Sequence, residues 1–175
     1  VAVEGKEYNT GYVDGEKLVA NVSAHELDVI INGKVKKAIQ IGTVMTDKNY
    51  RNKGLAAKLM DHVIKSNESK YDLIYLFANN EVKNFYPKFG FEAIEEVGSK
   101  ISIATKGKKD SNLRKLDISN EEDFNLIKRL TENRVPISEK LGIKNDQHLL
   151  MFYCLGFFKN FIYYLEEEDA IIIYI

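Results

Sequence analysis

The feature that most constrains the fold is a change in hydrophobic period near residue 50. Residues 17–46 are predicted as strands, because apolar residues there alternate with polar ones over short runs. The dipeptide Asn32-Gly33 within this stretch is typical of a two-residue hairpin turn. Residues 54–66 then carry a stripe of apolar residues at helical spacing. The pattern predicts an antiparallel meander with strands at 17–23, 25–31 and 35–46, followed by an amphipathic helix.

The rest of the N-terminal half alternates between strand and helix signals. An apolar run at 72–78 indicates a strand, and 80–89 indicates a short helix that Gly90 would end. Two more strands are expected at 91–97 and 100–105, as a second hairpin. Together these elements predict an α/β (α+β) fold.

A polar, basic run at 107–112 has no apolar residue and is predicted as a linker between domains at 1–106 and 113–175. After it we expect a strand, a helix that begins at a capping box of Ser119 and Glu122 and ends before Pro136, a second helix and a last strand. These elements are expected at 113–116, 119–134, 147–165 and 169–175.

Composition excludes several classes of protein. The 175 residues carry 25 basic and 26 acidic side chains, so nothing draws the chain as a whole to nucleic acid or to an anionic membrane. The single cysteine, Cys154, rules out an intrachain disulfide framework and indicates a reducing, cytoplasmic setting. The apolar stretch 149–165 is interrupted by polar residues and is shorter than the roughly 20 residues that a membrane span requires, so we predict a buried helix there.

The segment 44–56 carries the chemical signal. A strand ends, a loop with Arg51 and Lys53 follows, and a helix begins at Gly54. Free main-chain N–H groups and the positive end of the helix dipole meet at such a point, and together they bind phosphate. The segment lacks the glycine spacing of the nucleotide P-loop and of the Rossmann fingerprint. An ordinary helix start is the alternative for this segment alone.

Two motifs together resemble the GCN5-related N-acetyltransferase (GNAT) superfamily. Its acyl-coenzyme A signature, Arg/Gln-x-x-Gly-x-Gly/Ala, is matched by Arg51, Gly54 and Ala56. Its later motif reads Asn-x-x-Ala-x-x-x-Tyr-x-x-x-Gly-Phe, with Val82 in place of the alanine. The matching residues of that motif are Asn79, Tyr86, Gly90 and Phe91. The resemblance covers about residues 17–105 and implies a mixed, mostly antiparallel central sheet flanked by helices.

The resemblance also implies roles for individual residues. The strand formed by Val44, Met45 and Thr46 would pair with the pantetheine arm, and Asn79 would contact that arm. Tyr86 would protonate the leaving thiolate, since a phenol with a pKa of about 10 keeps its proton at neutral pH. A core aromatic beside Phe85 is the alternative for Tyr86. The main-chain amides that follow Arg51 would hold the pyrophosphate, namely those of Asn52, Lys53, Gly54, Leu55 and Ala56.

The general base stays open, with Glu26, Asp28 and His25 as candidates. The three histidines are scattered and lack partners at ligand spacing, so no metal site is predicted. His62 is expected at the surface, and Cys154 as a buried, inert thiol. The acidic run 166–169 is interpreted as a solvated turn.

The chain departs from the family at its start. A complete domain of the family opens with a strand and two helices, whereas residues 1–16 are few and Gly-rich and show no signal peptide. Residues 113–175 carry the missing types of element. One alternative is that they begin a degenerate second GNAT-like unit, in a chain clipped at both ends. The other is that they complete the first unit, either within the same chain or by exchange between copies.

These observations predict an acyl-CoA-dependent N-acyltransferase, with acetyl-CoA as co-substrate, no metal, and a small-molecule or protein amine as acceptor. Neither nucleic acid nor a membrane is expected as a partner. A non-catalytic acyl-CoA-binding or sensor module is the first alternative. A self-associating module built on the aromatic helix at 147–165, and so a homo-oligomer, is the second.

Overall fold

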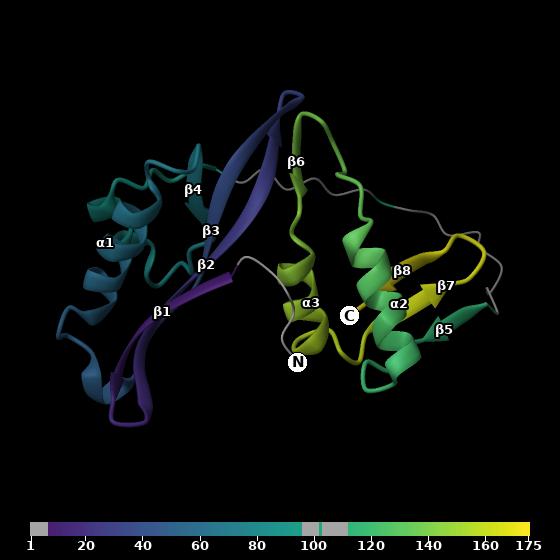
Figure 1. The fold of residues 1–175 in the computed structure, drawn as a ribbon, viewed down its shortest axis with the longest axis horizontal. Coiled ribbons are helices and arrows are strands. Elements are labelled where there is room, and N and C mark those ends of the chain that lie inside the picture. Colours follow the sequence, from purple (N-terminus) through teal and green to yellow (C-terminus); the bar gives the residue numbers. More distant parts are fainter. Residues whose placement is uncertain (1–6, 96–101, 103–111) are drawn as a thin grey trace. The chain divides into compact units, whose positions relative to one another are not determined.

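The computed structural model describes residues 7–95, 102 and 112–175, and it divides the chain into two compact units (Figure 1). Unit 1 comprises residues 1–92 and 135–148, and unit 2 comprises residues 93–134 and 149–175. The segment that follows the expected linker therefore contributes to both units. None of the helices in the described ranges has the length and apolarity that crossing a membrane requires.

Unit 1 is built on a mostly antiparallel five-stranded sheet, which confirms the predicted fold class. Its spatial order is β1-β2-β3-β4, and β6 also pairs with β2; among the described strands of this sheet, the β3–β4 pair alone is parallel. The Asn32-Gly33 turn joins β2 to β3 as predicted, with φ angles of 49° and 75°. The strands are β1 Glu7–Asp14, β2 Lys17–Ile31, β3 Lys34–Thr46, β4 Leu73–Leu76 and β6 Leu141–Lys144.

Three features of this sheet differ from the sequence prediction. The strands expected at 17–23 and 25–31 are one strand, because β2 is covered on both faces and its alternation is weak. β1 was not expected, because seven of its eight residues are exposed and show no apolar pattern. β6 was also missed; it lies opposite Asp28–Ile31 at the far end of β2.

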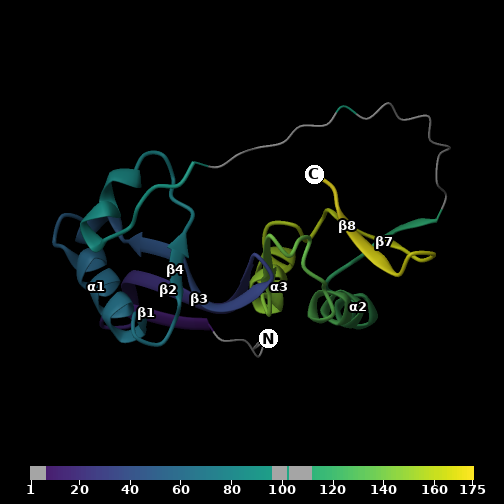
Figure 2. The ribbon, with the colours of Figure 1, turned by 90° about the horizontal axis from the view of Figure 1, so that it is seen from above.

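Helix α1, Leu55–Asn67, confirms the predicted amphipathic helix and packs on one face of the sheet (Figure 2). Its buried side chains are Leu59, Met60 and Val63. They join one apolar cluster with sheet residues and with Tyr86. The sheet residues of that cluster are Ala20, Val22, Ala24, Ile39 and Ile41.

The segment after β4 folds as two 3₁₀ turns, η2 Lys83–Phe85 and η3 Pro87–Phe89, where a helix over 80–89 was predicted. Pro87 has no N–H to donate to a preceding carbonyl, which prevents a continuous α-helix. Gly90 ends the turns, as predicted, with φ of 86°. Residues 91–95 form no strand, and the rest of the predicted second hairpin, like the linker up to residue 111, lies outside the described residues.

Unit 2 has a three-stranded antiparallel sheet in the order β5-β7-β8 with α2 against it. The helix predicted over 147–165 ends at Leu155; Gly156 follows, and β-branched and aromatic residues then form β7. Cys154 is fully buried as predicted, and burial raises the pKa of its thiol to about 11. The elements of unit 2 are β5 Leu113–Lys115, α2 Glu121–Glu132, β7 Ile162–Leu165 and β8 Ala170–Ile173, and α3 Gln147–Leu155 begins in unit 1 and continues into unit 2.

The acidic run at 166–169 is more than a solvated turn, because its last residue is engaged. Asp169 accepts two hydrogen bonds from the Arg129 guanidinium, at 2.7 and 2.6 Å, and one from the Tyr164 hydroxyl at 2.9 Å. These bonds hold the pKa of Asp169 at about 2. The turn between β7 and β8 is thereby tied to α2.

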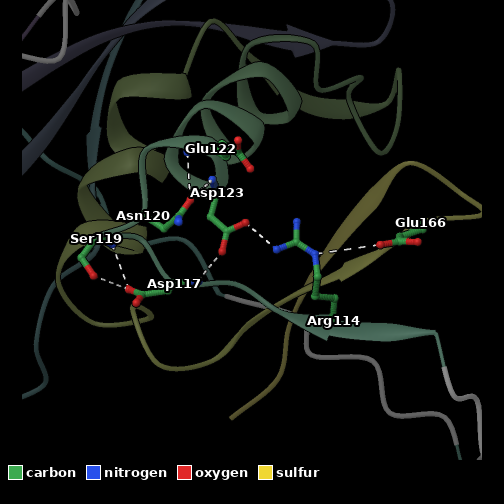
Figure 3. Close-up of polar contacts among 7 residues, drawn as sticks. All are labelled: Arg114, Asp117, Ser119, Asn120, Glu122, Asp123 and Glu166. Atoms are coloured by element: carbon green, nitrogen blue, oxygen red, sulfur yellow. Dashed lines mark hydrogen bonds and ion pairs between the residues drawn. The ribbon is translucent and has the colours of Figure 1, made fainter.

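The start of α2 is capped one residue later than predicted (Figure 3). The Oδ1 atom of Asn120 accepts hydrogen bonds from the N–H groups of Glu122 and Asp123, at 2.9 and 3.1 Å. Ser119 instead donates its hydroxyl to Asp117 Oδ1 at 2.5 Å. The predicted capping box of Ser119 and Glu122 is therefore wrong.

Asn120→Ala is expected to lower the free energy of unfolding by about 1 kcal/mol, the usual cost of losing an N-cap side chain. Ser119→Ala is the matched control and should cost less, since Asp117 still accepts the Ser119 N–H at 3.0 Å. Urea denaturation followed by circular dichroism measures both. A larger loss for Ser119→Ala than for Asn120→Ala would restore the capping box.

Candidate functional site

The loop between β3 and α1 is held in shape by the β1–β2 turn. Asp47 Oδ1 accepts the Asn49 N–H at 2.9 Å, which caps the 3₁₀ turn η1, Lys48–Tyr50. The Lys17 ammonium lies 2.7 Å from Asp47 Oδ2, and this contact holds the pKa of Asp47 below its usual value. The Tyr50 hydroxyl donates to Asp14 at 2.5 Å. These contacts fix the path of the chain into α1.

Two residues of this loop, Asn52 and Gly54, adopt the left-handed conformation, with φ of 62° and 73°. Gly54 is the N-cap of α1 and provides no side-chain hydrogen bond; the first bond within the helix runs from the Lys58 N–H to the Gly54 carbonyl at 3.1 Å. The N–H groups from Asn52 to Ala56 have no acceptor among the described residues. They form a set of main-chain donors at a helix N-terminus, an arrangement that can bind an anion.

The space and the charge around these donors suit a phosphate. A Cβ atom on Gly54 would meet no other atom within 4 Å, so the N-terminus of α1 is open. Arg51 lies at the same place, with its Nε 3.4 Å from the Thr46 carbonyl, and the Lys53 ammonium lies 4.8 Å from the centre of the Tyr50 ring. Both side chains are exposed. The predicted residues 51–56 therefore form one open, positively charged turn.

The end of β3 offers a second set of main-chain groups. Pairing between β3 and β4 ends at Ile41 and Leu76, whereas Val44, Met45 and Thr46 pair only with β2. An extra residue in β3 opposite Ser23 interrupts the β2–β3 register at the same level. On the β4 side, the last residues of β3 thus have no strand partner within the described residues, and an extended chain could pair there.

Asn79 and Tyr86 lie on the segment that follows β4. Asn79 is exposed, and its carbonyl accepts the Val82 N–H at 3.0 Å. Tyr86 is buried in the apolar cluster beneath α1, with the rings of Phe85 and Phe91 centred 5.3 and 6.2 Å away. Its hydroxyl has no hydrogen-bond partner among the described residues, and burial raises its pKa, so it keeps its proton at neutral pH. The structure thus shows a core position for Tyr86 whatever its chemical role.

The three candidates for the general base differ sharply in their surroundings. Glu26 accepts hydrogen bonds from the hydroxyls of Tyr8, at 2.7 Å, and Tyr71. Asp28 lies 2.8 Å from the Lys37 ammonium and accepts from Asn145 at 2.5 Å.

His25 is buried, with 5% of its surface exposed, and its Nδ1 atom has no hydrogen-bond partner among the described residues. Its ring stacks on that of His148, with the centroids 5.7 Å apart. No local pattern indicated this contact, because the two histidines lie in distant segments of the chain. His62 is exposed on α1, as predicted.

Comparison with known proteins places residues 3–94 in the family model described as "Acetyltransferase (GNAT) domain". A protein of Amsacta moorei entomopoxvirus that bears the provisional name glycylpeptide N-tetradecanoyltransferase is 28% identical over 169 residues, which are 95% of this chain. The chain spans about half of that relative's length, 52%.

Among solved structures, a Trypanosoma brucei acetyltransferase is 20% identical, with a TM-score of 0.47 over 57% of this chain and 70% of that one. A glucosamine-6-phosphate N-acetyltransferase from Arabidopsis thaliana is 26% identical, with a TM-score of 0.41 over 49% of this chain and 58% of that one.

Proposed function

The chain belongs to the GNAT acetyltransferase family, whose members use an acyl-coenzyme A as co-substrate, and on this premise we propose that it transfers an acyl group from coenzyme A directly to a primary amine. The observation that carries the proposal is the open turn at the N-terminus of α1. A diphosphate needs several donors and positive charge at one place, and the N–H groups of 52–56 supply the donors. Arg51 and Lys53 add the charge.

Two further parts complete the proposed site: the edge of β3 beyond Ile41, which pairs with no other described strand on the β4 side, and Tyr86. Val44, Met45 and Thr46 would hold the pantetheine arm through main-chain hydrogen bonds, and Asn79 would contact it. The main-chain N–H groups of this β3 edge would also stabilise negative charge on the thioester oxygen as the amine attacks. Tyr86 would give its proton to the sulfur as the carbon–sulfur bond breaks, a role that its raised pKa supports because the phenol stays protonated.

We propose that the transferred acyl group is acetyl. A specific observation favours a second candidate for the donor and the acceptor. The entomopoxvirus relative, which matches nearly the whole chain, is named for transfer of a tetradecanoyl group to a glycylpeptide. A long-chain acyl donor and a peptide with an N-terminal glycine are therefore the alternative substrate pair. Both alternatives use the same diphosphate site, so one experiment can separate them.

Calorimetric titration of the chain with acetyl-CoA and with tetradecanoyl-CoA tests the site. Release of free thiol then tests turnover, with three acceptors: a peptide that begins with glycine, an α-blocked lysine amide and benzylamine. We expect binding of at least one donor and thiol release that depends on an amine. Binding without thiol release would support the non-catalytic sensor, and no binding of either donor would rule out the site.

We also propose that unit 2 begins a second, degenerate GNAT-like unit. The relative that matches this chain is about twice its length. Unit 2 has its own sheet and its own buried side chains, including Leu116, Ile127 and Ile162. Residues 135–148 instead belong to unit 1, where β6 extends the sheet beside β2.

A further inference from the structure

We infer that His25, stacked on His148, is the group that takes the proton from the acceptor amine. The inference rests on the proposed function and names a residue for the step that the motifs leave unassigned. It begins from the face of the unit 1 sheet that α1 does not cover. That face carries buried polar residues at alternate positions of β2, namely Asn21, Ser23 and His25.

The other polar groups of this face are satisfied, and the histidines are not. Ser23 donates to Asn9 Oδ1 at 2.7 Å, and Asn21 donates to Ser23 Oγ at 3.2 Å. On the same face, the Tyr75 hydroxyl donates to Gln40 at 2.9 Å. In contrast, Nδ1 of His25 and Nε2 of His148 are buried without any partner among the described residues, and each residue is more than nine-tenths buried. Buried polar atoms of proteins are nearly always paired, so this exception calls for an explanation.

The position of His25 links it to the proposed acyl site. A Cβ atom on Gly42 would lie 2.7 Å from His25 Nε2, so the ring is packed against β3 where Gly42 lacks a side chain. Gly42 is the first residue of β3 after the pairing with β4 ends at Ile41. The imidazole therefore lies against the start of the strand edge that we propose for the thioester.

The proposed acid and base then lie on opposite faces of the sheet. Tyr86 belongs to the apolar cluster on the α1 face, with Ala20 and Val22 of β2. His25 belongs to the other face, because it follows Ala24 of that cluster in β2 and successive side chains of a strand point to opposite faces. A thioester held at the β3 edge between them could meet the base on one side and the acid on the other, so that one group takes a proton from the amine and the other gives one to the sulfur.

The protonation state of His25 suits a proton acceptor. Burial lowers the pKa of His25 and of His148, so both rings are neutral at pH 7 and each keeps a lone pair. The charged groups that face the pair are Glu7 on β1, Glu26 on β2 and Asp146 before α3, and their negative charge opposes this effect of burial.

The proton balance of the step closes. His25 takes one proton from the ammonium form of the acceptor, directly or through one water, and the neutral nitrogen forms its bond to the acyl carbon. The carbon–sulfur bond breaks, and Tyr86 protonates the sulfur. The amine nitrogen then loses its second proton, which reaches the Tyr86 phenolate through solvent. His25 releases to solvent the proton that it took from the ammonium. The net products are an amide, free thiol and one proton.

The pH dependence of kcat/KM for the amine tests the inference. The donor is acetyl-CoA or tetradecanoyl-CoA, whichever binds, and the acceptor is the most active of the three named above. The wild-type rate should fall in acid as His25 becomes protonated, at a pH below the ordinary histidine value of about 6.5, because burial lowers the pKa of His25. In His25→Gln we expect a loss of about 10²- to 10⁴-fold at pH 7. The variant's rate should then rise with unit slope up to the pKa of the amine, because only amine that is already neutral reacts.

His62→Gln, on the exposed side of α1, is the control and should match the wild type at every pH. Calorimetry on each variant should show unchanged acyl-CoA affinity, which separates failure of the inference from failure of the coenzyme site. A wild-type pH profile retained in His25→Gln, or an equal loss at every pH, would overturn the inference. If that variant does not fold, NMR titration of the wild-type His25 ring decides, since its pKa must coincide with the acid limb of the rate profile.

Discussion

Gly54→Asp is expected to weaken acyl-CoA binding by about 100-fold or more. The new carboxylate would stand among the N–H groups at the start of α1, where the structure leaves open space. A second negative charge about 4 Å from a phosphate costs on the order of 4 kcal/mol at an effective dielectric constant of about 20, and about 1.4 kcal/mol is a tenfold change in affinity. Part of this cost is lost to solvent screening, because the loop is exposed.

Two control variants separate charge from backbone strain in this experiment. Gly54→Asn adds the same bulk at the same φ of 73° without the charge, and it should lose far less affinity. Gly33→Asp adds the charge at a φ of 75° in the β2–β3 turn, at the opposite end of β2 from the Lys17–Asp47 contact, and should bind as the wild type does. Calorimetry measures all three. Affinity retained in Gly54→Asp would remove the diphosphate site from the proposal.

The elements that the sequence predicted correctly are those whose local pattern agrees with their packing. The stripe of α1 residues recurs at helical spacing because one face of the helix covers the sheet, and Leu59 and Val63 are buried on it. Asn32 and Gly33 favour a left-handed turn whatever surrounds them. The donor loop was likewise predictable, because a strand, a glycine and a helix start follow one another directly in the chain.

The elements that were missed depend on contacts between distant segments. β6 forms because Leu141–Lys144 meets the far end of β2, and nothing in the local sequence shows that partner. The helix predicted over 147–165 failed because apolar composition alone does not distinguish a buried helix from a buried strand, and Gly156 was the local sign of the break. The stacking of His148 on His25 could not be predicted for the same reason.

Tyr86→Phe is expected to lower kcat by about 10²- to 10⁴-fold and to leave acyl-CoA affinity unchanged. The variant removes the proton donor to the sulfur but keeps the ring that packs against Phe85 and Phe91. Its stability should change by less than about 1 kcal/mol, since the Tyr86 hydroxyl has no hydrogen-bond partner among the described residues. Steady-state thiol release gives kcat, and calorimetry gives the affinity.

Tyr75→Phe is the matched control, because it also removes a buried or half-buried tyrosine hydroxyl from unit 1. That hydroxyl donates to Gln40 at 2.9 Å, so the control should lose about 1 kcal/mol of stability and keep its kcat. The two variants thus separate a chemical role from a structural one: Tyr86→Phe should lose rate without stability, and Tyr75→Phe stability without rate. A kcat for Tyr86→Phe within about twofold of the wild type would reduce Tyr86 to a core aromatic, and protonation of the sulfur would then fall to solvent.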